Sequence, residues 1–292
     1  MRVFAAAALV SLTMTSASAD EIEWQRQIVK ANVAWADKRW AILKIDDAVY
    51  LKDGQSAYLT HEGKVYKWSL TAPPGIVPAV KYANGKALIR MLGQEGDLDL
   101  LTEKDNVLAL NERVDIVAQK TQIEPGQEGL RVMVYNQDSK AAKEFAGVEY
   151  YPYAKKYVVK ATLEPLAAPV AEDFQTSRGW WKRFYKVGEA VFMLDGKEQR
   201  LPFYSGTSDA SKLTEITAFF MDQLTGKETY GVGRYIDIAV ESGLPQTLTI
   251  DFNTAYNPNC ARSPHFNCPQ AKVTLTADLR AGERKPRTFP DH

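Results

Sequence analysis

Glycine-containing turns between short runs of alternating apolar and polar residues constrain the fold of this 292-residue chain most strongly. Three of the turns carry Asp-Gly or Asn-Gly, at Asp53-Gly54, Asn84-Gly85 and Asp195-Gly196. These dipeptides favour two-residue hairpin loops, because Asp, Asn and Gly tolerate positive φ angles. The turns therefore predict three antiparallel hairpins and argue against alternating strand and helix units.

Strand-like runs recur roughly every ten residues along most of the chain, a spacing typical of β-sandwiches and β-barrels. They occur at residues 48–52, 57–59, 79–82, 87–91, 107–110, 114–118, 130–135, 157–163, 190–194, 199–203, 216–221, 235–240, 247–252 and 273–279. About a dozen short antiparallel strands predict an all-β fold that is sandwich- or barrel-like.

A proline-rich stretch divides the strand pattern into two halves. Pro165, Pro169 and the polar residues 173–177 are the best candidate for an internal joint, since proline and polar clusters interrupt regular structure. The predicted units are an N-terminal β-module at 46–165 and a C-terminal β-module at 178–285. One continuous domain spanning 20–285 is the alternative.

The first residues predict export. Residues 1–19 combine Arg2, the apolar run Val3–Val10 and the small residues Ala17, Ser18 and Ala19, the three-part layout of a cleaved secretory signal peptide. The apolar run is shorter than the ~20 residues that span a bilayer. We therefore expect cleavage after Ala19, a periplasmic or extracellular location, and no transmembrane segment in the mature chain.

A helix is predicted at residues 20–45, before the first strand. Its apolar residues recur with spacings of four, three and four, which places them on one stripe of an amphipathic helix: Trp24, Ile28, Ala31 and Trp35. The helix should run from Asp20 to about Leu43. An apolar stripe of this kind usually packs on a sheet.

The charge balance excludes one class of partner. The chain has 36 basic and 36 acidic residues, so no net field attracts nucleic acid or anionic lipid. A P-loop and a complete dinucleotide fingerprint are both missing, and we expect no cofactor. The expected partner is instead an unknown small molecule or a component of the cell envelope.

The second half of the sequence resembles a known family. The resemblance is carried by Phe145–Pro152, Thr225–Tyr235, Asp251–Pro258, Cys260, Cys268-Pro269 and Ala281–Glu283. In this order they resemble the DUF1684 family, a group of mostly bacterial proteins whose function is uncharacterised. The likeness covers nearly the whole mature chain and is strongest from Ala218 to Glu283. It implies an all-β exported or envelope protein and assigns no reaction.

A polar cluster after the run 247–252 is the predicted ligand site. The segment from Asp251 to Cys268 concentrates amide, carboxylate and phenol groups, and a planar guanidinium nearby could grip an acidic ligand. In the structural alternative, Arg234 pairs with Asp251 and the asparagines only close turns. The candidate ligand-binding residues are Arg234, Asp251, Asn253, Tyr256 and Asn257.

The two cysteines lie in the same segment. In an exported chain, Cys260 and Cys268 predict a disulfide that would hold this loop in shape. The alternative is a zinc site formed by Cys260, His265 and Cys268, although this spacing matches no common zinc pattern. The predicted function is accordingly a small-ligand-binding or structural module of the bacterial envelope.

An envelope hydrolase is the second hypothesis. It would use Asp251 as a base, with Arg234 or Tyr256 stabilising developing charge. No G-x-S-x-G, H-E-x-x-H or similar motif supports it, and a triad of Ser263, His265 and Asp251 exists only on paper. The pair Trp180-Trp181 could stack on a sugar or peptide, but it more often marks the start of a packed strand.

Overall fold

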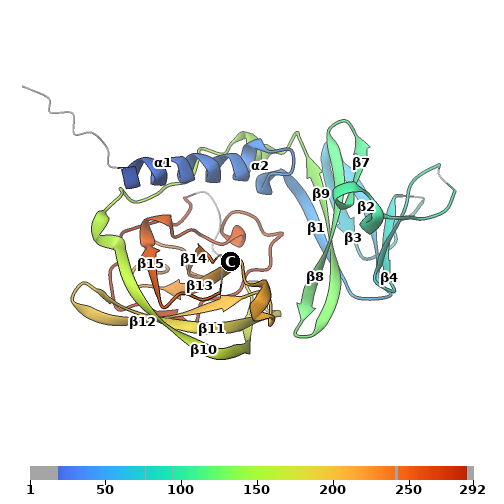
Figure 1. Ribbon diagram of the computed structural model, residues 1–292. Helices are drawn as coiled ribbons and strands as arrows, with labels where there is room; N and C mark the ends of the chain where they lie inside the picture. The colour runs from blue at the N-terminus through green and yellow to red at the C-terminus, as the bar shows by residue number, and fades with distance from the viewer. Residues whose placement is uncertain (1–18, 76, 94, 241–242, 288–292) are drawn as a thin grey trace, which may run out of the picture.

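The computed structural model describes residues 19–75, 77–93, 95–240 and 243–287. Figure 1 shows a mostly β protein, with a two-sheet module beside a strongly curved sheet and the N-terminal helix lying along the top. The predicted signal peptide lies outside the described residues, apart from Ala19, which begins the helix. Within the described ranges, no helix has the length and apolar character needed to cross a bilayer.

The N-terminal helix is shorter than the sequence predicts. α1 spans Ala19–Asn32 and continues as a π-helical turn, Val33–Asp37; a separate 3₁₀ turn follows at Ile42–Lys44. Just after the helix, two side chains bond the buried carboxylate of Asp115 in the first module. Arg39 donates hydrogen bonds of 2.7 and 2.8 Å to Asp115, and Trp40 Nε1 donates one of 2.9 Å.

The predicted stripe of the helix does face the protein. Trp24, Ile28 and Ala31 are half-buried and Trp35 is buried. The stripe contacts irregular segments of the second half of the chain, since Trp24 packs against the rings of Tyr150 and Tyr153. The helix therefore covers loops of the C-terminal half and not the face of a sheet.

The first β-module is a sandwich of two antiparallel sheets. One sheet has the order β1-β9-β8-β7 and the other the order β3-β2-β4-β5-β6. Apolar residues of both sheets, such as Leu51, Leu59, Val80, Ile116 and Val132, form one core between them. The strands are β1 Ile45–Leu51, β2 Ser56–Glu62, β3 Val65–Ser69, β4 Ala79–Ala83, β5 Lys86–Arg90, β6 Leu98–Asp99, β7 Val107–Asn111, β8 Val114–Glu124 and β9 Gln127–Asn136.

The second β-module is a single sheet that nearly closes into a barrel. Its order is β14-β13-β12-β11-β10-β15, and the short β16 pairs in parallel with β13. Tyr235 of β14 exchanges backbone hydrogen bonds of 2.9 and 3.0 Å with Tyr256, just after β15, which brings the two ends of the sheet together. The strands are β10 Val158–Gln175, β11 Trp181–Leu194, β12 Lys197–Ser205, β13 Glu215–Met221, β14 Arg234–Ala239, β15 Thr247–Asp251 and β16 Val273–Thr274.

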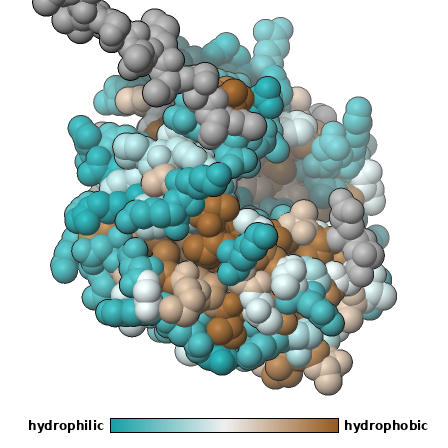
Figure 2. Space-filling view, turned by 60° about the vertical axis from the view of Figure 1, so that its left-hand side comes forward, coloured by the Kyte–Doolittle hydropathy of each residue, from teal (hydrophilic) through white to brown (hydrophobic). Residues whose placement is uncertain are grey.

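The barrel encloses a large apolar core, which includes Phe203, Phe220 and Phe252. The predicted strand at 273–279 pairs only over its first two residues. Its remaining apolar residues, Leu275, Ala277 and Leu279, lie beyond the strand and enter the core, and the Leu275 N–H still donates to the Met221 carbonyl of β13 over 2.9 Å. The side of the molecule at the left of Figure 1 shows apolar patches set among polar residues (Figure 2).

Two of the three predicted hairpins are confirmed. Asn84-Gly85 joins the paired strands β4 and β5, and Asp195-Gly196 joins β11 and β12. Both residues of each turn have positive φ, 51° and 73° in the first and 49° and 75° in the second, as a type I′ turn requires.

The third predicted hairpin is wrong. Asp53-Gly54 connects β1 and β2, which belong to opposite sheets of the sandwich. Only Gly54 has positive φ, 83°, and its N–H donates to Tyr82 of β4 over 2.8 Å. The same dipeptide therefore carries the chain across the core and not back along its own strand.

Residues 165–175 of the predicted joint lie within one continuous strand, and residues 176–177 begin the turn that follows it. β10 runs from Val158 to Gln175, and its register with β11 shifts between Pro165 and Val170. A bulge is one of the few places in a sheet where proline is tolerated, because proline cannot donate to the ladder. The change from one sheet to the other thus occurs between β9 and Val158.

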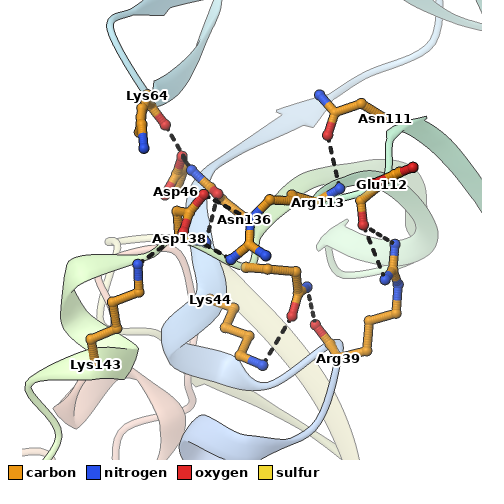
Figure 3. A network of polar contacts seen from close by, with 11 residues as sticks. Arg39, Lys44, Asp46, Lys64, Asn111, Glu112, Arg113, Asn136, Asp138 and Lys143 are labelled. Carbon is orange, nitrogen blue, oxygen red and sulfur yellow. Dashed lines mark hydrogen bonds and ion pairs between the residues drawn. The ribbon is translucent and has the colours of Figure 1, made fainter.

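A charged network ties the segment between the modules to the sandwich (Figure 3). Asp138 accepts two hydrogen bonds of 2.8 Å from Arg113 and one of 2.9 Å from Lys143 of the short helix α2, Lys140–Lys143. Asn136 Nδ2 donates to Asp46 and to the Lys64 carbonyl, each over 2.7 Å. These contacts fix α2 beside the first module.

Candidate functional site

Arg234, the central residue of the predicted ligand site, is buried in the barrel with 1% of its surface exposed. Its Nη2 donates to Asp222 Oδ2 over 2.8 Å and to the Leu279 carbonyl over 3.0 Å, while Nη1 bonds the Ala281 carbonyl. The predicted pairing of Arg234 with Asp251 is therefore wrong. The guanidinium joins the end of β13 to the C-terminal segment.

Asp251 and Asn253 form a closed hydrogen-bonded unit. Asp251 Oδ1 accepts from the N–H and from Nδ2 of Asn253, over 2.9 and 2.8 Å, and caps the 3₁₀ turn Phe252–Thr254. The Asn253 amide also bonds both backbone groups of Ala154, over 2.9 and 3.1 Å. These contacts hold the approach to β10 against the end of β15.

The remaining two predicted residues also bond within the protein. Tyr256 donates to Asp237 over 2.6 Å, and burial together with this carboxylate raises the pKa of the phenol. Asn257 Nδ2 donates to the Arg284 carbonyl over 2.8 Å. None of the five predicted residues lines either of the two cavities described below, and ligand binding by them stays a prediction.

The predicted disulfide is not present in this structure. Cys260 and Cys268 are buried free thiols, and the Cys260 N–H donates to Cys268 Sγ over 3.4 Å. The hydrogen bond between the thiols lowers the pKa of Cys260 and raises that of Cys268 well above its ordinary value. The two thiols therefore differ in acidity, and Cys260 is the more acidic of the pair.

The zinc alternative lacks the geometry it needs. Across the described part of the chain, no three His, Cys, Asp or Glu side chains are arranged to hold a metal ion. His265 turns instead to the first module, where its Nδ1 lies 3.5 Å from Asp47 Oδ1 of β1. Burial lowers the pKa of this imidazole.

This contact borders a cavity of about 360 Å³ between the two modules, which we call the interface cleft. The first module contributes two residues of β1, and the second contributes the turn between β10 and β11 and the loop around the cysteines. The lining residues are Asp47, Ala48, Ser177, Arg178, Cys260, Pro264, His265 and Phe266. Ligand sites occur preferentially at such boundaries.

One arginine that lines the interface cleft, and one that stacks on its wall residue Phe266, differ from most others in the described chain. Most arginines there lie within 4.0 Å of a carboxylate, but Arg131 of β9 and Arg178 do not. Arg178 Nη1 donates to the Pro264 carbonyl over 2.7 Å. The Arg131 guanidinium lies 4.4 Å from the centre of the Phe266 ring, and its buried Nε has no acceptor.

Lys182 of β11 adds a third cation behind the thiols. It is half-buried and has no carboxylate within 4.0 Å among the described residues. Burial lowers its pKa, and the positive charge of Arg131 lowers it further. Among the lining residues the charges of Asp47 and Arg178 balance. The net positive charge around the cleft comes from Arg131 and Lys182, which lie outside the lining and outweigh the nearby Asp46.

The sequence pointed to Cys260 and His265 but missed the cations. Arg178 and Lys182 flank the Trp180-Trp181 pair in the β10–β11 turn and the start of β11, but no local pattern links them to Arg131 of β9. Trp180-Trp181 was the nearest signal. β11 starts at Trp181, as predicted, but this side chain is 46% exposed and not packed. Trp180 packs edge-on against Tyr50 with the ring centres 5.0 Å apart.

Comparison with known proteins supports the predicted resemblance over part of the chain. Residues 143–284 match the family described as "Protein of unknown function (DUF1684)", a narrower range than predicted. The solution NMR structure of an uncharacterised protein from Haloarcula marismortui is 32% identical, covering 50% of this chain and 80% of that one, with a TM-score of 0.42. No curated protein matches the chain. The chain belongs to the DUF1684 family.

Proposed function

We propose that this protein is an exported binding protein and that the interface cleft takes a small ligand carrying a carboxylate. The observation that carries the proposal is the set of cations without carboxylate partners, Arg131, Arg178 and Lys182, around one cavity. Cations gathered without counter-charge repel one another, and a bound anion relieves that repulsion.

Each part of the interface cleft has a role in this binding. Arg178 lines the cavity and donates to the carboxylate, while Arg131 and Lys182 behind the wall add to the positive potential. Phe266 and Pro264 offer an apolar surface to the body of the ligand. A volume of about 360 Å³ falls in the lower part of the range for small-molecule sites.

Benzoate and benzamide form a matched pair of probes, since they share one shape and differ in charge. Benzoate should bind measurably by isothermal titration calorimetry and benzamide should not. Hydrogen bonds to charged groups contribute about 1.5–3 kcal/mol, so Arg178→Gln should weaken benzoate binding by roughly 10- to 100-fold. Arg131→Gln, which removes only a nearby charge, should have a smaller effect that disappears at high salt.

Arg284→Gln is the control for these variants. Arg284 also has no carboxylate partner among the described residues, but it stacks on Tyr151, 5.2 Å from the ring centre, away from the cleft. Its replacement should leave benzoate affinity unchanged. Equal binding of benzoate and benzamide, or equal losses in all three variants, would rule out the proposed site.

The proposed export rests on residues 1–19. Amino-terminal sequencing of the protein from its native host should begin at Asp20. A protein that retains Met1 and fractionates with cytosolic markers would contradict export without affecting the ligand site.

A thiol-dependent reaction in the same cleft is the second candidate. Cys260 borders the cavity, and its pKa is lowered by the hydrogen bond from Cys268. The hydrolase mechanism based on Asp251 has less support, because Asn253 donates two hydrogen bonds to its Oδ1 and Asp251 lines neither described cavity. Alkylation by iodoacetamide should be faster at Cys260 than at Cys268. If neither cysteine reacts until a reductant is added, the pair is oxidised and this candidate fails.

A further inference from the structure

A second cavity, of about 770 Å³, lies beside α2 and away from the interface cleft. We call it the α2 cavity. Three parts of the chain enclose it: Leu43, the segment 140–149 that begins with α2, and the C-terminal loops. The lining residues are Leu43, Lys140, Ala141, Glu144, Phe145, Ala146, Gly147, Glu149, Arg262, Pro286 and Arg287.

The walls of the α2 cavity are held by specific contacts. Ser139 caps α2 and donates its hydroxyl to the Leu43 carbonyl, and Lys143 anchors the helix to Asp138 (Figure 3). Further along the same segment, between the lining residues Gly147 and Glu149, the Val148 N–H donates to Asn32 Oδ1 over 2.8 Å. The cavity is therefore formed before any ligand enters.

One buried cation supplies the polar group of the cavity. Arg262 is 4% exposed, lies 5.0 Å from the centre of the Trp35 ring, and bonds through Nη1 to Glu283. Its other N–H groups have no acceptor within the described residues, and they are not among the fully enclosed unpaired atoms. These donors remain open to a molecule in the cavity.

The charges around the α2 cavity are balanced, unlike those of the interface cleft. Glu283 is 1% exposed and neutralises Arg262. At the rim, Arg287 lies 2.9 Å from Glu149, and Lys140 lies 3.7 Å from Glu144. A second buried carboxylate here would stand near Glu283 and lose its hydration without gaining an unpaired cation.

We propose that the α2 cavity binds an uncharged, mainly apolar molecule whose carbonyl oxygen, in an amide or ester, accepts a hydrogen bond from Arg262. Leu43, Phe145 and Pro286 then cover its apolar body. Fixed donors inside an apolar wall are the usual design of small-molecule sites. This site is independent of the carboxylate site proposed at the interface cleft.

Octanamide and octanoate test the proposal, because they share a chain and differ in charge. Ligand-observed NMR titration should give saturable binding of octanamide, with octanoate weaker by roughly tenfold or more. Binding of octanoate as tight as that of octanamide would overturn the proposal, as would no binding of octanamide.

Two variants place the binding in this cavity. Ala146→Phe adds a ring at the cavity wall and should weaken octanamide binding by at least roughly tenfold, whereas Ala109→Phe, at an exposed position on β7, should not. Arg262→Met should also weaken binding, but it leaves Glu283 unpaired, so Ala146→Phe decides the matter if that variant fails to fold. Unchanged affinity in Ala146→Phe would refute the site. Arg178→Gln should leave octanamide binding intact, which separates this result from that at the interface cleft.

Discussion

Replacing Asp222 by Asn should be among the most destabilising single changes in the second module. The substitution is nearly isosteric and keeps the Oδ1 acceptor that bonds the Leu224 N–H over 2.7 Å. It removes the negative charge from Arg234, whose side chain and that of Asp222 are each 1% exposed. Breaking one partner of a buried ion pair costs about 3–5 kcal/mol, because the other charge is left unpaired.

This cost converts to a measurable change in melting temperature. One kcal/mol shifts the Tm of a protein of similar size by about 2–4 °C, so Asp222→Asn should lower it by about 6–20 °C. Circular dichroism melts of the reduced protein would measure the Tm, and urea titrations would measure the free energy of unfolding.

A double variant separates the unpaired charge from general damage. Asp222→Asn/Arg234→Met removes both charges, and it should be more stable than Asp222→Asn alone even though carbonyls such as that of Leu279 lose a donor. A Tm loss below about 2 °C in Asp222→Asn, or a double variant no more stable than the single one, would refute the reasoning.

Three further changes test other parts of the account. Hydrogen bonds from Arg113 and Lys143 hold the pKa of Asp138 well below its ordinary value. The stability that Asp138 contributes is therefore present above the unfolded pKa of about 3.9 and is lost as pH falls through the folded pKa. Asp138→Asn should flatten the fall of the urea midpoint between pH 6 and pH 3, and an unchanged slope would contradict this role. Gly282→Ala should lower the free energy of unfolding by about 1–3 kcal/mol, because its φ is 73° and a Cβ would lie 2.5 Å from the Ala255 carbonyl oxygen. Gly206→Ala, with no atom within 4 Å of the added carbon, should stay within about 0.5 kcal/mol of wild type. Equal effects of the two variants would contradict this explanation. Asn253→Ala should lower the free energy of unfolding by about 1–3 kcal/mol and leave benzoate affinity unchanged, because the Asn253 amide only joins Asp251 to Ala154. A loss of benzoate affinity without a loss of stability would instead indicate that Asn253 binds the ligand.

Local sequence predicted those parts of the fold that local contacts determine. Asn84-Gly85 and Asp195-Gly196 were interpreted correctly because both turn residues adopt positive φ and the strands pair directly. Asp53-Gly54 has the same letters but crosses between sheets, since β1 pairs with the distant β9. The residues of a turn do not indicate whether the strands on either side pair with each other or with strands far away in sequence.

The candidate site shows the same division. The segment with Cys260 and His265 stood out as a polar run, and it does border the interface cleft. Arg234 was assigned the wrong partner because Asp222 lies in a turn that the strand pattern did not connect to it. The cations of the cleft come from β9 of the first module and from the β10–β11 turn and β11 of the second, so their lack of carboxylate partners is visible only in the folded chain.

Side-chain NMR of the arginine Nε–H groups tests the carboxylate site most directly. Arg178 lines the interface cleft, Arg131 lies behind its wall, and Arg284 lies elsewhere. During titration with benzoate at constant ionic strength, the account predicts a saturable shift of the Arg178 signal, a smaller one of Arg131, and none of Arg284. No shift at Arg178, or shifts of equal size at all three arginines, would contradict it.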